Sequence, residues 1–265
     1  MFPKIQLGVK YFRYWFYASN SKGHGIHSPF VFNLIKNVLN DEQQYPEYLQ
    51  VEGLRSSLRY DKNILSVEDL GAGSLTQKSK HRTIGSIARN AAKPARYGQL
   101  LFRMIRHFKS KSIIEAGTSL GITTSYLSMA NPGASIISLE GAEEVADIAI
   151  RNFEKLHLKN IKIIKGNFDV TLSEALNELP APDFVFIDGN HRKEPTINYF
   201  EQILAKAHND TIIVFDDIHW SEGMEEAWKT ICQNPAVTVI IDLFFIGIVF
   251  FRKENKEKQH FFIRF

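Results

Sequence analysis

The segment SIIEAGTSLGITTSYLS, residues 112–128, carries an acid and two glycines where a predicted strand turns into a predicted helix. Glu115 lies at the end of the apolar run, and Gly117 and Gly121 follow it with GxxxG spacing. A turn of this kind directs backbone N–H groups and a helix N-terminus at a ligand beyond the carboxyl end of a sheet. We therefore predict a ligand site at this turn.

The charge at this turn indicates the class of ligand. A dinucleotide fold needs GxGxxG around its pyrophosphate, and the carboxylate of Glu115 would repel that group. A cationic sulfonium that bears an amino group suits Glu115 better. Glu140 ends the next predicted strand, where a carboxylate can accept hydrogen bonds from both hydroxyls of a ribose. Together the two acids predict S-adenosylmethionine as the cofactor.

A third turn follows the third predicted strand and contains Gly166, Asn167, Phe168 and Asp169. Its backbone groups, its phenyl ring and its side-chain acceptors suit an adenine ring. The alternative is a purely structural turn that leads into a helix capped by Thr171, the first residue of a TxxE capping box. Both interpretations of Asn167 and Asp169 stay open at this point.

The elements that must position these residues form an α/β pattern. From residue 112 onward, short β-branched runs alternate with amphipathic runs, as in a parallel sheet wrapped by helices. The predicted strands are 112–115, 135–140, 161–164, 183–188, 211–216, 237–242 and 246–252. The predicted helices lie near 121–130, 143–157, 171–179, 194–207 and 221–233. The last two strands are too close for a crossover helix, so we predict an antiparallel hairpin.

We predict that residues 1–95 form a mostly helical N-terminal extension and that residues 96–265 form the ligand-binding domain. We expect the aromatic stretch YFRYWFY, residues 11–17, to pack on its own domain; a membrane surface or a partner is the alternative. The glycine turn DLGAGS, residues 69–74, lacks a full strand before it, and we assign it to a loop. His24 and His27 lack a third metal ligand, so we favour a helix start at Ser28 and Pro29.

Composition limits the classes of binding partner and indicates the cellular compartment. The 265 residues are 44% hydrophobic, and 32 basic against 29 acidic residues leave a net charge of +3, too little for a dedicated nucleic-acid binder. The single cysteine, Cys232, excludes an internal disulfide framework. We expect neither a signal peptide nor a transmembrane helix. These features predict a cytoplasmic protein with a small-molecule substrate and no nucleic-acid partner.

The run YGQLLFRMIRHFKSKSIIEAGTSLGITTSYLSMA resembles the catechol O-methyltransferase-like enzymes of the class I methyltransferases, and the likeness spans residues 97–252. It implies the Rossmann-like methyltransferase sheet of seven strands and O-methyl transfer to a small hydroxylated acceptor, for which the family suggests an aromatic alcohol. It also places Gly98 and Gln99 beside the cofactor. The predicted cofactor-binding residues are Gly98, Glu115, Gly117, Thr118, Ser119, Gly121, Glu140, Gly141, Asn167, Phe168 and Asp188. A homodimer is a further implication.

The resemblance also implies a magnesium site. In that family the acid ending the fourth strand and an Asp-Asn pair ending the fifth hold the ion, and here these positions are Asp188, Asp216 and Asp217. Three carboxylates suit Mg²⁺ or another hard divalent cation. The alternative is that Asp188 caps a loop or contacts the cofactor while the other two accept backbone hydrogen bonds.

His191 falls where the catechol enzymes have a catalytic lysine. An imidazole suits a general base near neutral pH, so we predict His191 and Asp188 as catalytic residues, with a solvated loop histidine as the alternative. Two other function classes are alternatives: a nucleotide-binding oxidoreductase of Rossmann type, and a non-catalytic interaction protein that kept the fold.

Overall fold

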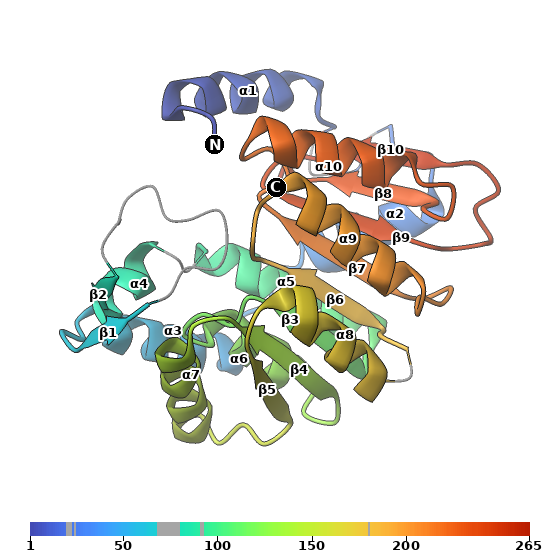
Figure 1. The fold of residues 1–265 in the computed structure, drawn as a ribbon. Helices are drawn as coiled ribbons and strands as arrows, with labels where there is room; N and C mark the ends of the chain where they lie inside the picture. The colour runs from blue at the N-terminus through green and yellow to red at the C-terminus, as the bar shows by residue number, and fades with distance from the viewer. Residues whose placement is uncertain (20–22, 24, 68–79, 91–92, 180) are drawn as a thin grey trace. The chain divides into compact units, whose positions relative to one another are not determined.

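A computed structural model of the chain describes residues 1–19, 23, 25–67, 80–90, 93–179 and 181–265 (Figure 1). The chain forms two compact units. Unit 1 comprises residues 1–41 and 180–265, and unit 2 comprises residues 42–179. The DLGAGS turn at 69–74 and His24 lie outside the described residues.

Unit 2 contains three parallel strands, β3 (Ser112–Ala116), β4 (Ser135–Glu140) and β5 (Ile161–Lys165), with β4 in the middle. The register pairs Glu115 with Ser138 and Glu140 with Lys165. Strands that run parallel end at the same edge of a sheet. The two predicted ligand-binding acids therefore lie at that edge, on neighbouring strands.

The helices of unit 2 begin and end at local signals. Helix α6 (Ile122–Ala130) starts after Gly121, and it ends before the predicted stop at Asn131. Helix α7 (Glu143–Lys155) follows β4, and α8 (Phe168–Glu178) follows β5. Helices α3 (Pro46–Arg59), α4 (Ile84–Asn90) and α5 (Ala95–Phe108) precede the sheet, with a short antiparallel pair formed by β1 (Ile64–Ser66) and β2 (His81–Thr83).

One predicted helix start is wrong. Helix α8 begins at Phe168 and not at Thr171, because the side chain of Asn167 accepts a hydrogen bond from the backbone N–H of Asp169 at 3.0 Å and caps the helix one turn earlier. The hydroxyl of Thr171 instead donates to the Asn167 carbonyl from inside the helix.

The described part of unit 1 contains five paired strands. β6 (Phe184–Ile187) runs parallel to β7 (Ile212–Asp216), β7 runs antiparallel to β9 (Ile246–Phe250), and β9 runs antiparallel to β8 (Val239–Asp242). The predicted hairpin is therefore confirmed. A further strand that the sequence pattern did not predict, β10 (Gln259–Phe262), pairs in parallel with β8. Helices α9 (Lys193–Leu204) and α10 (Glu222–Gln233) complete this part of unit 1.

The N-terminal part of unit 1 is helical, as expected. Helix α1 (Lys4–Tyr17) is followed by α2 (Pro29–Leu34) and by a π-helical turn at Ile35–Leu39. The predicted helix start is confirmed, because the Ser28 side chain caps α2 and Pro29 occupies its first turn. Ser19 forms an isolated parallel bridge with Ile263 beyond β10. None of the helices within the described residues is long and apolar enough to cross a membrane.

Gly247 in β9 is needed for packing in unit 1. A Cβ atom added there would lie 2.5 Å from Cη2 of Trp228. Trp228 is 5% exposed, and its indole N–H donates to Asp242 at 3.3 Å. The ring is therefore held in place and cannot easily move away.

We predict that Gly247→Ala lowers the free energy of unfolding by about 1–3 kcal/mol, measured by urea denaturation. Gly53 is the control, because it lies inside α3 with nothing within 4 Å of an added Cβ. Gly53→Ala should raise stability by about 0.5–1 kcal/mol. Equal stability of Gly247→Ala and the wild type would contradict the packing argument.

Candidate functional site

Glu115 is fully buried within unit 2, and hydroxyl groups hold its carboxylate. Its Oε2 accepts hydrogen bonds from Ser138 Oγ at 2.6 Å and from Thr124 Oγ1. Among the described residues its other oxygen, Oε1, has no hydrogen-bond partner. A buried acceptor without a partner costs roughly 1–3 kcal/mol, so this oxygen marks a place where a donor from a ligand would fit.

Burial raises the pKa of Glu115 from its ordinary value of 4.5 to about 7, although the hydrogen bonds from Ser138 and Thr124 oppose the shift. The nearby charge of Glu140 adds to the increase. A cationic ligand would favour the ionised form of this carboxyl. The pair of acids is therefore suited to a positively charged group.

Glu140 joins the turn after β3 to the turn after β4. Its Oε2 accepts from the backbone N–H of Ser119 at 2.7 Å, and its Oε1 accepts from that of Ala142 at 2.9 Å. A carboxylate oxygen has two lone pairs and can accept more than one hydrogen bond, which is the property that binding of ribose hydroxyls requires. Gly141 lies between Glu140 and Ala142, in the turn that follows β4.

The turn between β3 and α6 has the backbone of a ligand-binding loop. Gly117, Ser119 and Gly121 all have positive φ, at 116°, 48° and 78°. Serine rarely adopts this conformation, and such strain is concentrated at functional sites. The backbone N–H groups of Gly117 and Thr118 both donate to the Leu139 carbonyl at 3.0 Å, which joins the turn to β4.

Two predicted cofactor glycines also have a packing role. A Cβ on Gly98, in α5, would lie 2.5 Å from the ring of Tyr126, and a Cβ on Gly121 would lie 2.4 Å from Phe153. Close packing of helices against one another therefore explains the absence of a side chain at both positions. Contact of Gly98, Gly121 and Gln99 with a cofactor stays a prediction.

The turn after β5 is a helix start. Asn167 caps α8 as described above, and Phe168 and Asp169 are the first two residues of that helix. The structural interpretation of Asn167 is thus supported, with a different helix start from the one predicted. Contact of Asn167 or Phe168 with adenine stays a prediction.

Unit 1 gathers a different set of site residues. Asp188, His191 and Asp216 each offer a ligand atom, and these atoms lie within 4.8 Å of one another. Asp216 is buried, whereas Asp188 and His191 are partly exposed, with His191 Nε2 3.6 Å from Asp188 Oδ1. Two carboxylates and an imidazole form a suitable donor set for a divalent cation.

Asp217 does not belong to this group within the described part of the chain. Its backbone N–H donates to the Phe245 carbonyl at 2.7 Å, and its φ is 54°. His191 takes the third position instead, and it also has positive φ, at 42°, as does Asn190 at 67°. The predicted role of Asp217 as a metal ligand stays a prediction.

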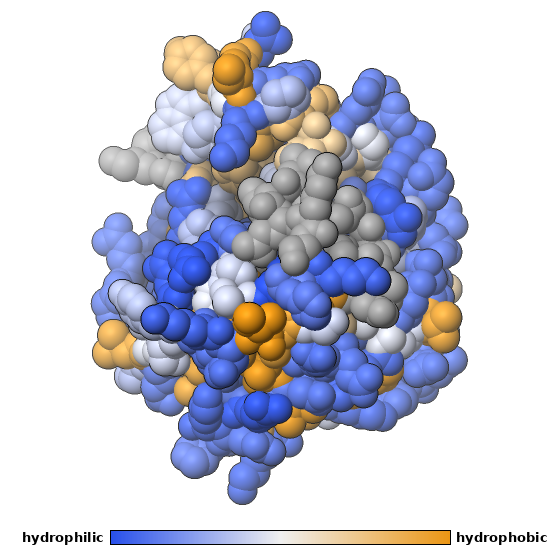
Figure 2. Space-filling view, turned by 60° about the vertical axis from the view of Figure 1, so that its left-hand side comes forward, coloured by the Kyte–Doolittle hydropathy of each residue, from blue (hydrophilic) through white to orange (hydrophobic). Residues whose placement is uncertain are grey.

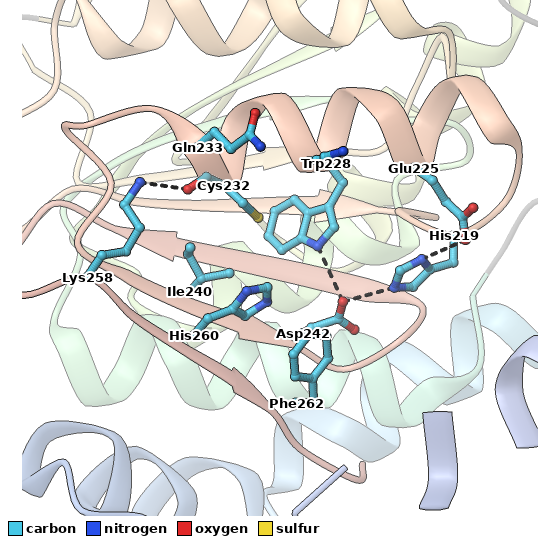
Figure 3. A pocket seen from close by; sticks show the side chains of 11 residues that line it. His219, Glu225, Trp228, Cys232, Gln233, Ile240, Asp242, Lys258, His260 and Phe262 are labelled. Carbon is cyan, nitrogen blue, oxygen red and sulfur yellow. Dashed lines mark hydrogen bonds and ion pairs between the residues drawn. The ribbon is translucent and has the colours of Figure 1, made fainter. Parts of the chain in front are cut away.

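His219 lies in a network that the sequence did not reveal (Figure 3). Its Nε2 lies 2.9 Å from Asp242 Oδ2 and its Nδ1 lies 3.1 Å from Glu225 Oε1. Burial alone would lower the pKa of His219, but the two carboxylates outweigh it and raise the pKa. His219 is therefore held as part of an ion-pair network that includes Lys10, which contacts Glu225 at 2.8 Å.

This network borders a cavity of about 400 Å³ between α10, β8 and β10. The side chains of Trp228, Cys232 and Ile240 contribute to its largely apolar lining. Burial and the charge of Asp242 raise the pKa of the Cys232 thiol to about 12, which disfavours the thiolate form. The cavity lining does not include Asp188, His191 or Asp216.

The raised pKa of Glu115 predicts a pH-dependent stability. Below about pH 4.5 the carboxyl is protonated in both the folded and the unfolded chain. Between pH 4.5 and 7 the unfolded chain loses the proton first, so the free energy of unfolding falls as pH rises, by about 3 kcal/mol in total. Glu115→Gln removes this contribution, and its stability relative to the wild type should rise by that amount between pH 4.5 and 8.

Urea denaturation at several pH values measures the effect. The control is Glu174→Gln, an exposed carboxyl on α8. If the difference between Glu115→Gln and the wild type is the same at pH 4.5 and pH 8, Glu115 is not the buried, protonated group described here.

Comparison with known proteins shows which family model and which solved structures this chain is similar to. A family model described as a methyltransferase domain matches residues 114–218. This segment contains Glu115, the glycine turn and Glu140. It also contains the candidate cation ligands Asp188, His191 and Asp216. No curated protein matches the chain in sequence.

Several solved structures share the fold at low sequence identity. The SAH-bound methyltransferase PaMTH1 of Podospora anserina has a TM-score of 0.60 at 13% identity, covering 86% of this chain and 97% of its own. The O-methyltransferase from Bacillus cereus, in complex with SAH, has a TM-score of 0.54 at 20% identity, covering 81% and 95%.

TomG of Streptomyces achromogenes, an O-methyltransferase involved in tomaymycin synthesis and solved with SAM, has a TM-score of 0.53 at 18% identity, covering 62% of this chain and 82% of its own. At these identities the similarity shows the fold. The predicted Rossmann-like methyltransferase sheet is thereby confirmed, and residues 114–218 are similar in sequence to a methyltransferase domain.

Proposed function

We propose that this protein is an S-adenosylmethionine-dependent O-methyltransferase that acts on a small hydroxylated acceptor. The observation that carries the proposal is the pair of acids on neighbouring strands, Glu115 in β3 and Glu140 in β4, on either side of a strained glycine turn. Structural neighbours with this fold were crystallised with SAM or SAH, and the family match supports the same activity.

Each acid has a role in holding the cofactor. Glu140 accepts hydrogen bonds from the ribose hydroxyls, and Glu115 Oε1 serves the cationic amino acid end, directly or through a water molecule. The turn residues Gly117, Thr118 and Ser119 supply backbone contacts. The remaining predicted contacts are Gly98, Gly121, Gly141, Asn167, Phe168 and Asp188.

Asp188, His191 and Asp216 are the residues that would hold a divalent cation, and their mixed oxygen and nitrogen donors suit Mn²⁺ as well as Mg²⁺. A cation there would supply positive charge that favours the ionised form of an acceptor hydroxyl. His191 then acts as a ligand. Without a cation, the partly exposed imidazole of His191 takes the proton from the hydroxyl group of the substrate, and Asp188 orients the ring.

The reaction transfers a methyl group from sulfur to oxygen. The acceptor oxygen forms a bond to the methyl carbon as the carbon–sulfur bond breaks, and the sulfur leaves as a neutral thioether. The hydroxyl proton passes to a base. The protein's main contributions are the alignment of the two reactants and the removal of the proton.

The two other function classes are less well supported. A nucleotide-binding oxidoreductase needs a pyrophosphate turn, whereas here the carboxyl of Glu115, at the end of β3, would repel a pyrophosphate. The three similar structures named above are methyltransferases. A non-catalytic interaction protein would have no need of two buried or strained acidic sites.

We further propose a small-molecule acceptor, no nucleic-acid partner, a homodimer and a cytoplasmic location. The near-balanced charge supports the absence of a nucleic-acid partner, and the single cysteine supports the cytoplasmic location. We retain residues 1–95 as an extension to the domain at 96–265; this extension contributes residues 1–41 to unit 1 and residues 42–95 to unit 2.

Glu140→Gln tests the cofactor site. The substitution keeps the shape of the side chain but removes the charge that favours the ribose hydroxyls, so we expect binding of S-adenosylmethionine to weaken by about tenfold to a hundredfold. Titration calorimetry measures it. Glu143→Gln is the control, because Glu143 is three residues away and its side chain is 81% exposed. Unchanged affinity in Glu140→Gln, or binding of NAD instead, would refute the proposal.

Asp216→Asn tests the cation site. We expect it to weaken binding of Mn²⁺ at least tenfold, followed by the electron paramagnetic resonance signal of the free ion, because one of two carboxylate ligands loses its charge. Asp210→Asn, at a carboxyl whose side chain is 74% exposed, should bind as the wild type does. If neither Mn²⁺ nor Mg²⁺ binds the wild type, transfer is metal-free and relies on His191.

A further inference from the structure

Helix α1 has two faces of different character. Leu7, Lys10, Tyr11 and Tyr14 are partly buried against the rest of unit 1. The ring of Tyr11 packs edge-on against Phe244, with centroids 5.0 Å apart, and Lys10 forms its ion pair with Glu225. This inner face supports the expectation that the aromatic stretch packs on its own chain, but only for part of the stretch.

The outer face of α1 is apolar and exposed. Ile5, Val9, Phe12 and Phe16 are 84%, 48%, 63% and 65% exposed. Their spacing of four, three and four residues places them along one side of a helix. The rings of Phe12 and Phe16 pack against each other, edge to face, with centroids 4.7 Å apart. Figure 2 shows apolar side chains standing out at the top of the view, where Figure 1 has α1.

Basic residues flank this apolar stripe. Lys4 and Arg13 are exposed on α1, and the first acidic residue of the chain is Asp41. A helix that faces water normally presents polar side chains on its outer side. Here the outer side combines four large apolar residues with positive charge at its borders, which is the composition of helices that lie on lipid surfaces.

A second copy of the chain suits this face less well. Stable protein interfaces use roughly 20–30 residues on each side, and the stripe has four. Two α1 helices packed together would also bring Lys4 and Arg13 of each copy near the same positive charges of the other. An anionic bilayer reverses this repulsion into attraction, and long basic side chains can reach its headgroups while the stripe enters the acyl region.

We propose that α1 binds the surface of an anionic phospholipid bilayer, with Ile5, Val9, Phe12 and Phe16 inserted below the headgroups and with Lys4 and Arg13 among them. The helix lies in the plane of the membrane and does not cross it. None of these residues belongs to the proposed cofactor or cation sites, so the proposal does not depend on the enzymatic activity.

Sedimentation of the full-length protein with vesicles tests the proposal. The protein should sediment with vesicles of phosphatidylcholine that contain phosphatidylglycerol, bind pure phosphatidylcholine far more weakly, and be released at about 0.5 M salt. The combined variant Ile5→Ser, Phe12→Ser, Phe16→Ser should lower the partition coefficient at least tenfold. Removing two charges with Lys4→Gln and Arg13→Gln should lower it roughly thirtyfold.

Matched controls use exposed residues elsewhere. Leu49, Tyr60 and Val170 are 79%, 85% and 58% exposed, and their combined replacement by serine should leave vesicle binding unchanged. Lys62→Gln with Lys256→Gln controls for charge. Circular dichroism checks that each variant folds. Wild-type protein that stays in the supernatant with anionic vesicles overturns the proposal. A concentration-dependent dimer that the stripe variant abolishes, without vesicle binding, overturns it in favour of a second copy.

Discussion

The hydrogen bonds of Glu140 are the interaction on which the ligand-binding edge of unit 2 depends. One carboxylate holds the backbone of Ser119 in the turn after β3 and that of Ala142 in the turn after β4. The same residue's carbonyl accepts from Gly166, at the end of β5. Three consecutive turns are thus tied to one residue. A loop that is already ordered before a ligand arrives costs less conformational entropy on binding.

A second constraint is the burial of charge near this edge. Glu115 is tolerated in the interior because Ser138 and Thr124 donate to it and because its raised pKa allows it to stay protonated. Asp216 in unit 1 is likewise buried at the end of a strand. Each unit therefore places a carboxyl where desolvation is costly, which is the expected signature of a group kept for chemistry.

The sequence predicted the large elements well, because β-branched runs and amphipathic runs alternate clearly from residue 112. The seven predicted strands all exist, with ends that differ by about one or two residues for most. β10 was missed because QHFF mixes polar and apolar residues and follows the family's last strand. The cap of α8 was misplaced because Asn167 and Thr171 are both good N-cap residues, and sequence alone does not choose between them.

The site was predictable only in part. Strand ends identify Glu115, Glu140, Asp188 and Asp216 as candidates, since each follows an apolar run. The hydroxyls of Thr124 and Ser138 come from a helix and a neighbouring strand and have no local signal. His191 lies beside Asp188 and Asp216 and has a positive φ. A histidine in the sequence does not by itself indicate this backbone conformation.

The division of the chain has a consequence for biosynthesis. Unit 2 is one continuous stretch, whereas unit 1 needs residues 1–41 and residues 180–265 together. During translation, unit 2 leaves the ribosome complete while α1 and α2 still lack β8 to β10, including the bridge from Ser19 to Ile263. The apolar surfaces of the N-terminal helices that pack on these strands therefore stay exposed until synthesis ends. Chaperone binding to the nascent chain is expected to concentrate on that early segment.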